Sequence, residues 1–111
     1  MERREKLAKL VQRLGQIADY PIERVSESTR LYHDAGIAGD DYWEFMIWFS
    51  HEFRIALKGM DLRDFSPPEG WLWPWQRRRL NYKELRLADL IELSEFDSWE
   101  QSGMSARLTS S

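Results

Sequence analysis

The feature that most constrains the fold of this chain is the spacing of its apolar residues, which follows the period of an α-helix in three segments. These segments cover about residues 2–19, 40–57 and 87–99. In each of them apolar side chains recur every three or four residues, with charged residues between them. A chain of 111 residues forms one domain with a single modest core. We therefore predict an all-α fold, a small antiparallel helical bundle.

Proline and glycine residues mark the ends of these segments. Tyr20 precedes Pro21, and the residue before a proline is driven out of the helical region, so the first helix should end there. A Pro-Pro-Glu-Gly break and a tryptophan-rich insert, residues 67–75, precede the last helix. Residues 1–101 are expected to form one domain, whereas residues 102–111 have little apolar periodicity and are expected to fray.

The predicted second helix has one strongly apolar face and one charged side. Trp43 and Ile47 widen the apolar face on one flank, whereas Trp48 lies among the charged residues opposite. A tryptophan on a charged side is unusual and makes Trp48 a candidate contact residue. Taken over the whole chain, the apolar faces predict a core of Leu10, Leu14, Ile17, Val25, Leu31, Phe45, Met46, Phe49, Phe53, Leu87, Leu90 and Ile91.

Composition excludes several classes of function. The chain has no cysteine, so disulfides, thiolate metal sites and cysteine nucleophiles are absent. Its net charge of −3 argues against general affinity for nucleic acids. The charged start of the chain leads into no apolar signal region, and no stretch approaches the roughly 18 apolar residues of a membrane span. We therefore expect a cytoplasmic protein with no membrane partner.

Within residues 30–57, Asp34 and Gly36 stand in a loop before the second predicted helix, which ends in Glu52-Phe53-Arg54-Ile55. This ordered spacing resembles acyl carrier proteins. In that family a loop reading Asp-Leu-Gly-x-Asp-Ser-Leu-Asp opens a helix that ends Glu-Glu-Phe-Gly-Ile. The resemblance covers about residues 5–57 and resumes weakly at Leu87-Ala-Asp-Leu-Ile. The Gly-Asp-Asp turn and the later Pro-Pro-Glu-Gly look more closely like a group of small bacterial carrier-like proteins without an assigned function. Seven residues match the family pattern without a gap: Asp34, Gly36, Asp41, Glu44, Glu52, Phe53 and Ile55.

The resemblance fails at the residue that defines the family's chemistry. Where carrier proteins have the serine that receives 4′-phosphopantetheine, this chain has Gly39, which has no hydroxyl group to form a phosphodiester. The nearest serines are Ser26, Ser28 and Ser50, which lie elsewhere in the aligned loop or inside the second helix. We therefore expect no cofactor at Gly39.

Carrier proteins meet their partner enzymes through acidic residues of the second helix. The resemblance implies that Asp41 and Glu44 keep this acidic pattern, whereas Trp48, Ser50 and His51 dilute it. We take Asp40, Asp41, Glu44 and Trp48 of this helix as candidate partner-binding residues. The resulting hypothesis is a non-catalytic interaction module that binds a protein partner, itself a monomer or weak homodimer. The alternative is a genuine carrier that is modified at a non-standard serine.

Trp71, Trp73 and Trp75 stand directly before Arg77-Arg78-Arg79. Alternating tryptophans can pack on the core or dock a protein partner, since tryptophan and arginine dominate interface hot spots. They can also stack the bases of a single-stranded nucleic acid, with the arginines on its phosphates, and the acidic net charge makes this the least favoured reading. We include the three tryptophans among the candidate partner-binding residues.

The remaining polar residues do not form a recognisable catalytic or metal site. Asp40, Asp41 and Glu44 are better explained by the positive end of the helix dipole and a solvated face than by a metal. The two histidines, His33 and His51, show no ligand spacing. Ser50 and His51 are adjacent on a helix and point about 100° apart, so they cannot act as nucleophile and base. We predict no enzymatic activity.

Overall fold

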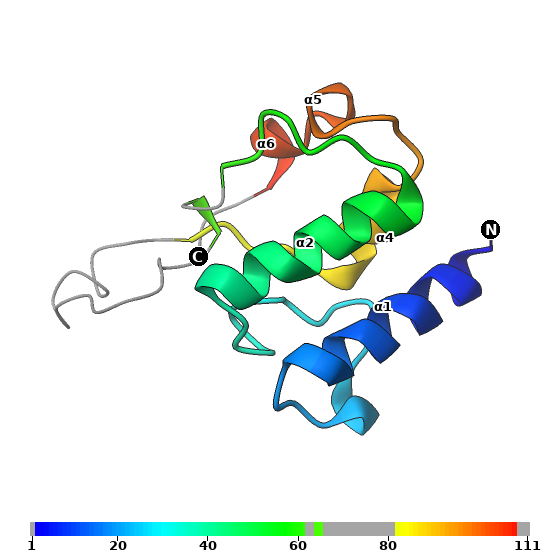
Figure 1. Ribbon diagram of the computed structural model, residues 1–111, viewed down its shortest axis with the longest axis vertical. Coiled ribbons are helices and arrows are strands. Elements are labelled where there is room, and N and C mark those ends of the chain that lie inside the picture. The colour runs from blue at the N-terminus through cyan, green and yellow to red at the C-terminus, as the bar shows by residue number, and fades with distance from the viewer. Residues whose placement is uncertain (1, 62–63, 66–81, 109–111) are drawn as a thin grey trace, which may run out of the picture.

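The computed structural model describes residues 2–61, 64–65 and 82–108, and this part of the chain is mostly helical (Figure 1). Its β-structure consists of two isolated bridges, Arg30 with Arg86 and Ala56 with Ser98. The prediction of an all-α chain is confirmed for these residues. The elements are α1 (Arg3–Ile17), a 3₁₀ turn η1 (Ile22–Arg24), α2 (Gly39–Phe53), α4 (Leu87–Leu93), α5 (Trp99–Ser102) and α6 (Met104–Arg107).

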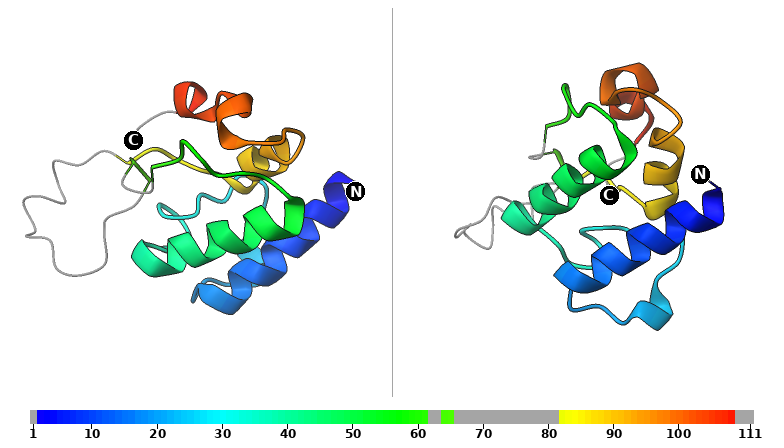
Figure 2. Two further views of the ribbon diagram at one scale, coloured as in Figure 1. Left: turned by 45° about the horizontal axis from the view of Figure 1, so that its top comes forward. Right: turned by 45° about the vertical axis from the view of Figure 1, so that its right-hand side comes forward.

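The two long helices, α1 and α2, lie side by side and run in opposite directions (Figure 2). Contacts between them fix this direction. The Nζ atom of Lys9 lies 2.5 Å from Oε1 of Glu52. One turn further along α1, the guanidinium carbon of Arg13 lies 5.9 Å from the ring centre of Trp48, one turn back along α2. A connection of residues 18–38 joins the two helices, and it contains η1.

The core forms where α1, α2 and α4 meet, and nine of the twelve predicted core residues are buried there. The other three, Ile17, Val25 and Phe53, are partly buried and pack against it. The core is larger than the predicted list, because it includes further residues of the predicted helices and also residues from the segments between them. The additional large buried side chains are Ile37, Tyr42, Ile55, Phe65, Tyr82, Leu85, Leu93, Trp99 and Met104.

Helix α2 ends at Phe53 rather than near Leu57, which corrects the predicted boundary. Arg54 adopts the left-handed conformation, with φ 57°, and its N–H bonds to the carbonyl of Ser50. The turn places Ile55, 2% exposed, in the core. The helix therefore ends early because Ile55 is buried and because the next residue, Ala56, pairs with Ser98.

The predicted last helix, 87–99, is also wrong in its length, because α4 ends at Leu93. Ser98 caps a separate short helix by accepting a hydrogen bond from the N–H of Gln101 at 3.1 Å. The N–H of Trp99 bonds to the carbonyl of Ala56 at 2.7 Å, so pairing with the segment after α2 draws the chain out of the helix.

Residues 102–107 include the end of α5 and the whole of α6, although the sequence pattern predicts little regular structure there. Helix α6 holds Met104, which is 1% exposed. The indole Nε1–H of Trp99 donates to Oγ of Ser105 at 2.7 Å. A periodicity argument misses this segment because its order depends on one methionine and on contacts to Trp99, and not on a continuous apolar face.

Candidate functional site

Gly39 opens α2, at the position that the resemblance matches to the modified serine of carrier proteins. It is buried, and its φ of 59° lies in the left-handed region. Ala38 before it is extended. Residues with a Cβ atom adopt positive φ only at a cost, so this backbone conformation favours glycine over serine.

The outer face of α2 carries a stripe of residues that we call the α2 stripe: Asp40, Trp43, Glu44 and Ile47. Their spacing places them on one side of the helix. Trp43 is 38% exposed and Ile47 is 40% exposed, and they are two of the three large apolar side chains exposed in the described part of the chain. Asp40 and Glu44 beside them are exposed as well. The α2 stripe therefore combines two apolar side chains with two carboxylates.

Trp48 does not lie on this exposed face, although the sequence pattern placed it among the charged residues. It is half-buried, because α1 covers this flank of α2. Its ring centre lies 5.6 Å from that of Phe45 and 6.1 Å from that of Phe53, and Arg13 lies over it. The opposite flank, with Trp43 and Ile47, is the exposed one, and the apolar pattern alone could not distinguish the two flanks.

The remaining predicted contact residues do not all join the α2 stripe. Asp41 is exposed in the first turn of α2, one residue around the helix from Asp40. Trp71, Trp73 and Trp75, together with the arginines that follow them, lie outside the described residues. The structure therefore brings together Asp40 and Glu44 and adds Trp43 and Ile47, which the apolar pattern of the helix assigns to the edge of the core.

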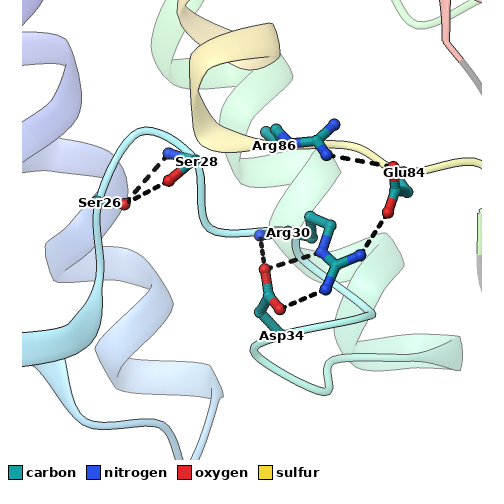
Figure 3. Close-up of polar contacts among 6 residues, drawn as sticks. All are labelled: Ser26, Ser28, Arg30, Asp34, Glu84 and Arg86. Carbon is teal, nitrogen blue, oxygen red and sulfur yellow. Dashed lines mark hydrogen bonds and ion pairs between the residues drawn. The ribbon is translucent and has the colours of Figure 1, made fainter.

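An ion-pair network fastens the connection before α2 to the segment before α4 (Figure 3). The guanidinium of Arg30 lies between the carboxylates of Asp34 and Glu84, and Arg86 pairs with Glu84 at 3.2 Å. Asp34 Oδ1 accepts from Nη2 of Arg30 at 2.8 Å, while its Oδ2 accepts from the backbone N–H of Arg30 at 2.8 Å. The hydrogen bond from Arg30 lowers the pKa of Asp34 to about 2 and is the main cause of the lowered pKa of Glu84.

The other polar candidates, one histidine and three serines, lie among contacts within the fold. Burial, followed by the nearby charge of Arg30, lowers the pKa of His33. Ser26 Oγ and Ser28 Oγ lie 2.9 Å apart in the turn before Arg30, as Figure 3 shows. Ser50 Oγ donates to the carbonyl of Ile55 at 2.6 Å and so supports the end of α2.

The described part of the chain contains neither a candidate metal site nor a helix that could cross a membrane. Within residues 2–61, 64–65 and 82–108 there is no group of three or more histidine, aspartate or glutamate side chains placed to hold a metal ion. Among the helices of the same residues, none has the length and apolar character needed to cross a membrane.

Comparison of the chain with models of protein families, with curated proteins and with solved structures finds no significant match.

Proposed function

We propose that this protein is a carrier-like helical domain without a prosthetic group, which acts by binding a protein partner through the α2 stripe. The observation that carries the proposal is the exposure of Trp43 and Ile47, one turn apart on the side of α2 that also carries the carboxylates of Asp40 and Glu44. Exposed tryptophan on a folded helix is costly in water and is enriched at the centres of protein interfaces.

The arrangement of the helices supports the carrier-like part of this proposal. The described chain has a first long helix, a long pinned connection, a second helix that begins at Gly39 and a later helix, α4, against α1. The resemblance in sequence implies the same order. The burial and positive φ of Gly39 support the proposed loss of the arm, because an attached group needs an accessible side chain at this position.

The chemistry of the α2 stripe defines the partner surface. Trp43 and Ile47 need an apolar pocket, and Asp40 and Glu44 favour lysine or arginine around that pocket. Truncation of a central tryptophan in such an interface costs about 2 kcal/mol or more, which corresponds to at least about thirtyfold in affinity. Reversal of the two carboxylates should slow association and change its dependence on salt.

Site-specific photo-crosslinking tests the proposal. A benzophenone amino acid is placed at position 47 on the α2 stripe, and at position 23 in η1 as a control that is also exposed. After irradiation in the source cells, we expect one adduct that forms from position 47 and not from position 23. The crosslinked protein is then purified, and its affinity is measured by calorimetry with the wild type and with Trp43→Ala.

A matched control separates the α2 stripe from general surface hydrophobicity. Ile22 is 56% exposed on η1, so Ile22→Ala removes an exposed apolar side chain elsewhere and should leave the affinity unchanged. Asp40→Lys with Glu44→Lys should weaken binding most at low salt. Equal adducts from both positions, or equal affinities for wild type and Trp43→Ala, would overturn the proposal.

A further inference from the structure

A cleft runs between α1 and α2, on the flank of α2 that Trp48 occupies. Its volume is about 310 Å³. This lies at the lower end of the range of small-molecule sites, roughly 300–1,000 Å³. Because the cleft lies on the flank of Trp48, the width of α2 separates it from the α2 stripe. Four of its side chains come from α1 and two from α2: Lys9, Gln12, Arg13, Gln16, Trp48 and Glu52.

The positively charged side chains of α1 differ in whether a carboxylate pairs with them. Arg3 pairs with Glu27, Lys6 with Glu95 and Lys9 with Glu52. Arg4, which is exposed, and Arg13 have no carboxylate partner in the described part of the chain, and of these two Arg13 lines the cleft. The cleft therefore holds two cations, Lys9 and Arg13, against the single carboxylate of Glu52.

Arg13 has unused capacity to donate hydrogen bonds. Its Nη1 donates to Oε1 of Gln16 at 3.1 Å. Its Nε is buried and finds no acceptor among the described residues. A guanidinium presents five N–H donors in a planar fork that matches a carboxylate. Because Nε is buried and Gln16 takes one bond from Nη1, the donors that Arg13 keeps for an anion in the cleft are the remaining N–H groups of its two Nη atoms.

Trp48 supplies an aromatic wall beside this cation. The guanidinium carbon of Arg13 lies 5.9 Å from the ring centre, near the outer limit of cation–π contact at about 6 Å. Phe45 and Phe53 pack on the ring from within α2 and hold it in place. A flat apolar group can stack on such a fixed ring, and the amides of Gln12 and Gln16 can orient its polar end.

We propose that the cleft between α1 and α2 binds a small aromatic carboxylate, with its carboxylate on Arg13 and its ring against Trp48. This site is independent of the proposed partner surface, because it uses the other flank of α2. The open form and small volume of the cleft limit the affinity, and we expect a dissociation constant on the order of 1 mM for a simple probe.

Titration of the ¹⁵N-labelled protein with 2-naphthoate tests the site by NMR. The indole N–H signal of Trp48, one of six tryptophans, is identified by its loss in Trp48→Phe. We expect saturable shifts of this signal and of the amides of residues 9–16. Neutral 2-naphthalenemethanol lacks the carboxylate and cyclohexanecarboxylate lacks the flat ring, so both should bind more weakly.

Three variants make the test specific. Arg13→Gln should weaken binding of 2-naphthoate by at least about tenfold, because it removes a charged hydrogen-bond donor. Arg13→Lys keeps the charge but loses the fork, and should weaken it by a smaller factor. Arg4→Gln removes an exposed cation from the same helix outside the cleft and should leave binding within about twofold of the wild type.

Each contrary result has a defined meaning. Absence of saturable shifts overturns the proposal, as does equal binding of the neutral alcohol. Equal weakening by Arg4→Gln and Arg13→Gln would show general attraction to a basic helix and would also overturn it. The dispersion of the amide spectrum reports whether each variant is folded, and Arg13→Lys carries the test if Arg13→Gln unfolds.

Discussion

Replacement of Asp34 by asparagine tests how much the ion pair with Arg30 contributes to the stability of the fold. Asp34 accepts hydrogen bonds from the backbone N–H, Nε and Nη2 of Arg30. The same guanidinium reaches the carboxylate of Glu84, so the pair joins the connection before α2 to the segment before α4. Asp34→Asn keeps the shape of the side chain but removes its charge.

The expected magnitude follows from the pKa of Asp34, which falls from 3.8 to about 2 in the folded protein. A difference of that size corresponds to about 2.4 kcal/mol. The side chain is 30% exposed, and solvent screening reduces this to about 1 kcal/mol. Because the folded pKa is the lower one, this stabilisation is present above pH 3.8 and is lost as the pH falls towards 2.

Urea unfolding, followed by the helical circular dichroism signal, measures this effect for wild type and Asp34→Asn between pH 7 and pH 2. We expect the variant to be less stable by about 1 kcal/mol at pH 7, with the difference shrinking to a few tenths near pH 2. Glu44→Gln, which removes an exposed carboxylate beyond the first turn of α2, serves as the control. A difference that is absent at pH 7, or that stays constant down to pH 2, refutes the reasoning.

Three further predictions concern stability in the same urea assay. Trp99→Ala should lower the free energy of unfolding by about 3–5 kcal/mol, because it empties the site of the largest fully buried side chain; a loss below about 1 kcal/mol contradicts its place in the core. Arg54→Gly should raise stability by about 1 kcal/mol, because residue 54 holds φ 57° at the end of α2. Gly39→Ala should lower it by about 1–2 kcal/mol because φ is 59° there, and an unchanged or higher stability would show that positive φ is not required.

The positions of the helices could be predicted from the sequence because their apolar faces are also the faces that form the core. Phe45, Met46 and Phe49 follow the helical period and are fully buried. The ends of the helices could not be predicted in the same way. Ala56 and Ser98 form a bridge across the fold, and this pairing ends α2 early and divides the predicted last helix. Such long-range pairing leaves no periodic signal in either segment.

The candidate site was predicted in part. The acidic residues Asp40 and Glu44 could be assigned to an exposed side from their position on the helix. The flank occupied by α1 could not be assigned from the pattern of α2 alone, so the exposed side chains are Trp43 and Ile47 in place of Trp48. The cleft that holds Arg13 arises from the packing of two helices, and the sequence of either helix gives no sign of it.

The central claim is that this protein is a carrier-like helical domain without a prosthetic group. The intact mass of the protein tests this claim most directly. The chain is co-expressed with a broad-specificity phosphopantetheinyl transferase, and a genuine acyl carrier protein in the same cells shows that the transferase is active. We predict that the carrier gains the mass of phosphopantetheine and that this chain keeps the mass of its sequence. A stoichiometric gain of that mass on any serine of this chain would contradict the account.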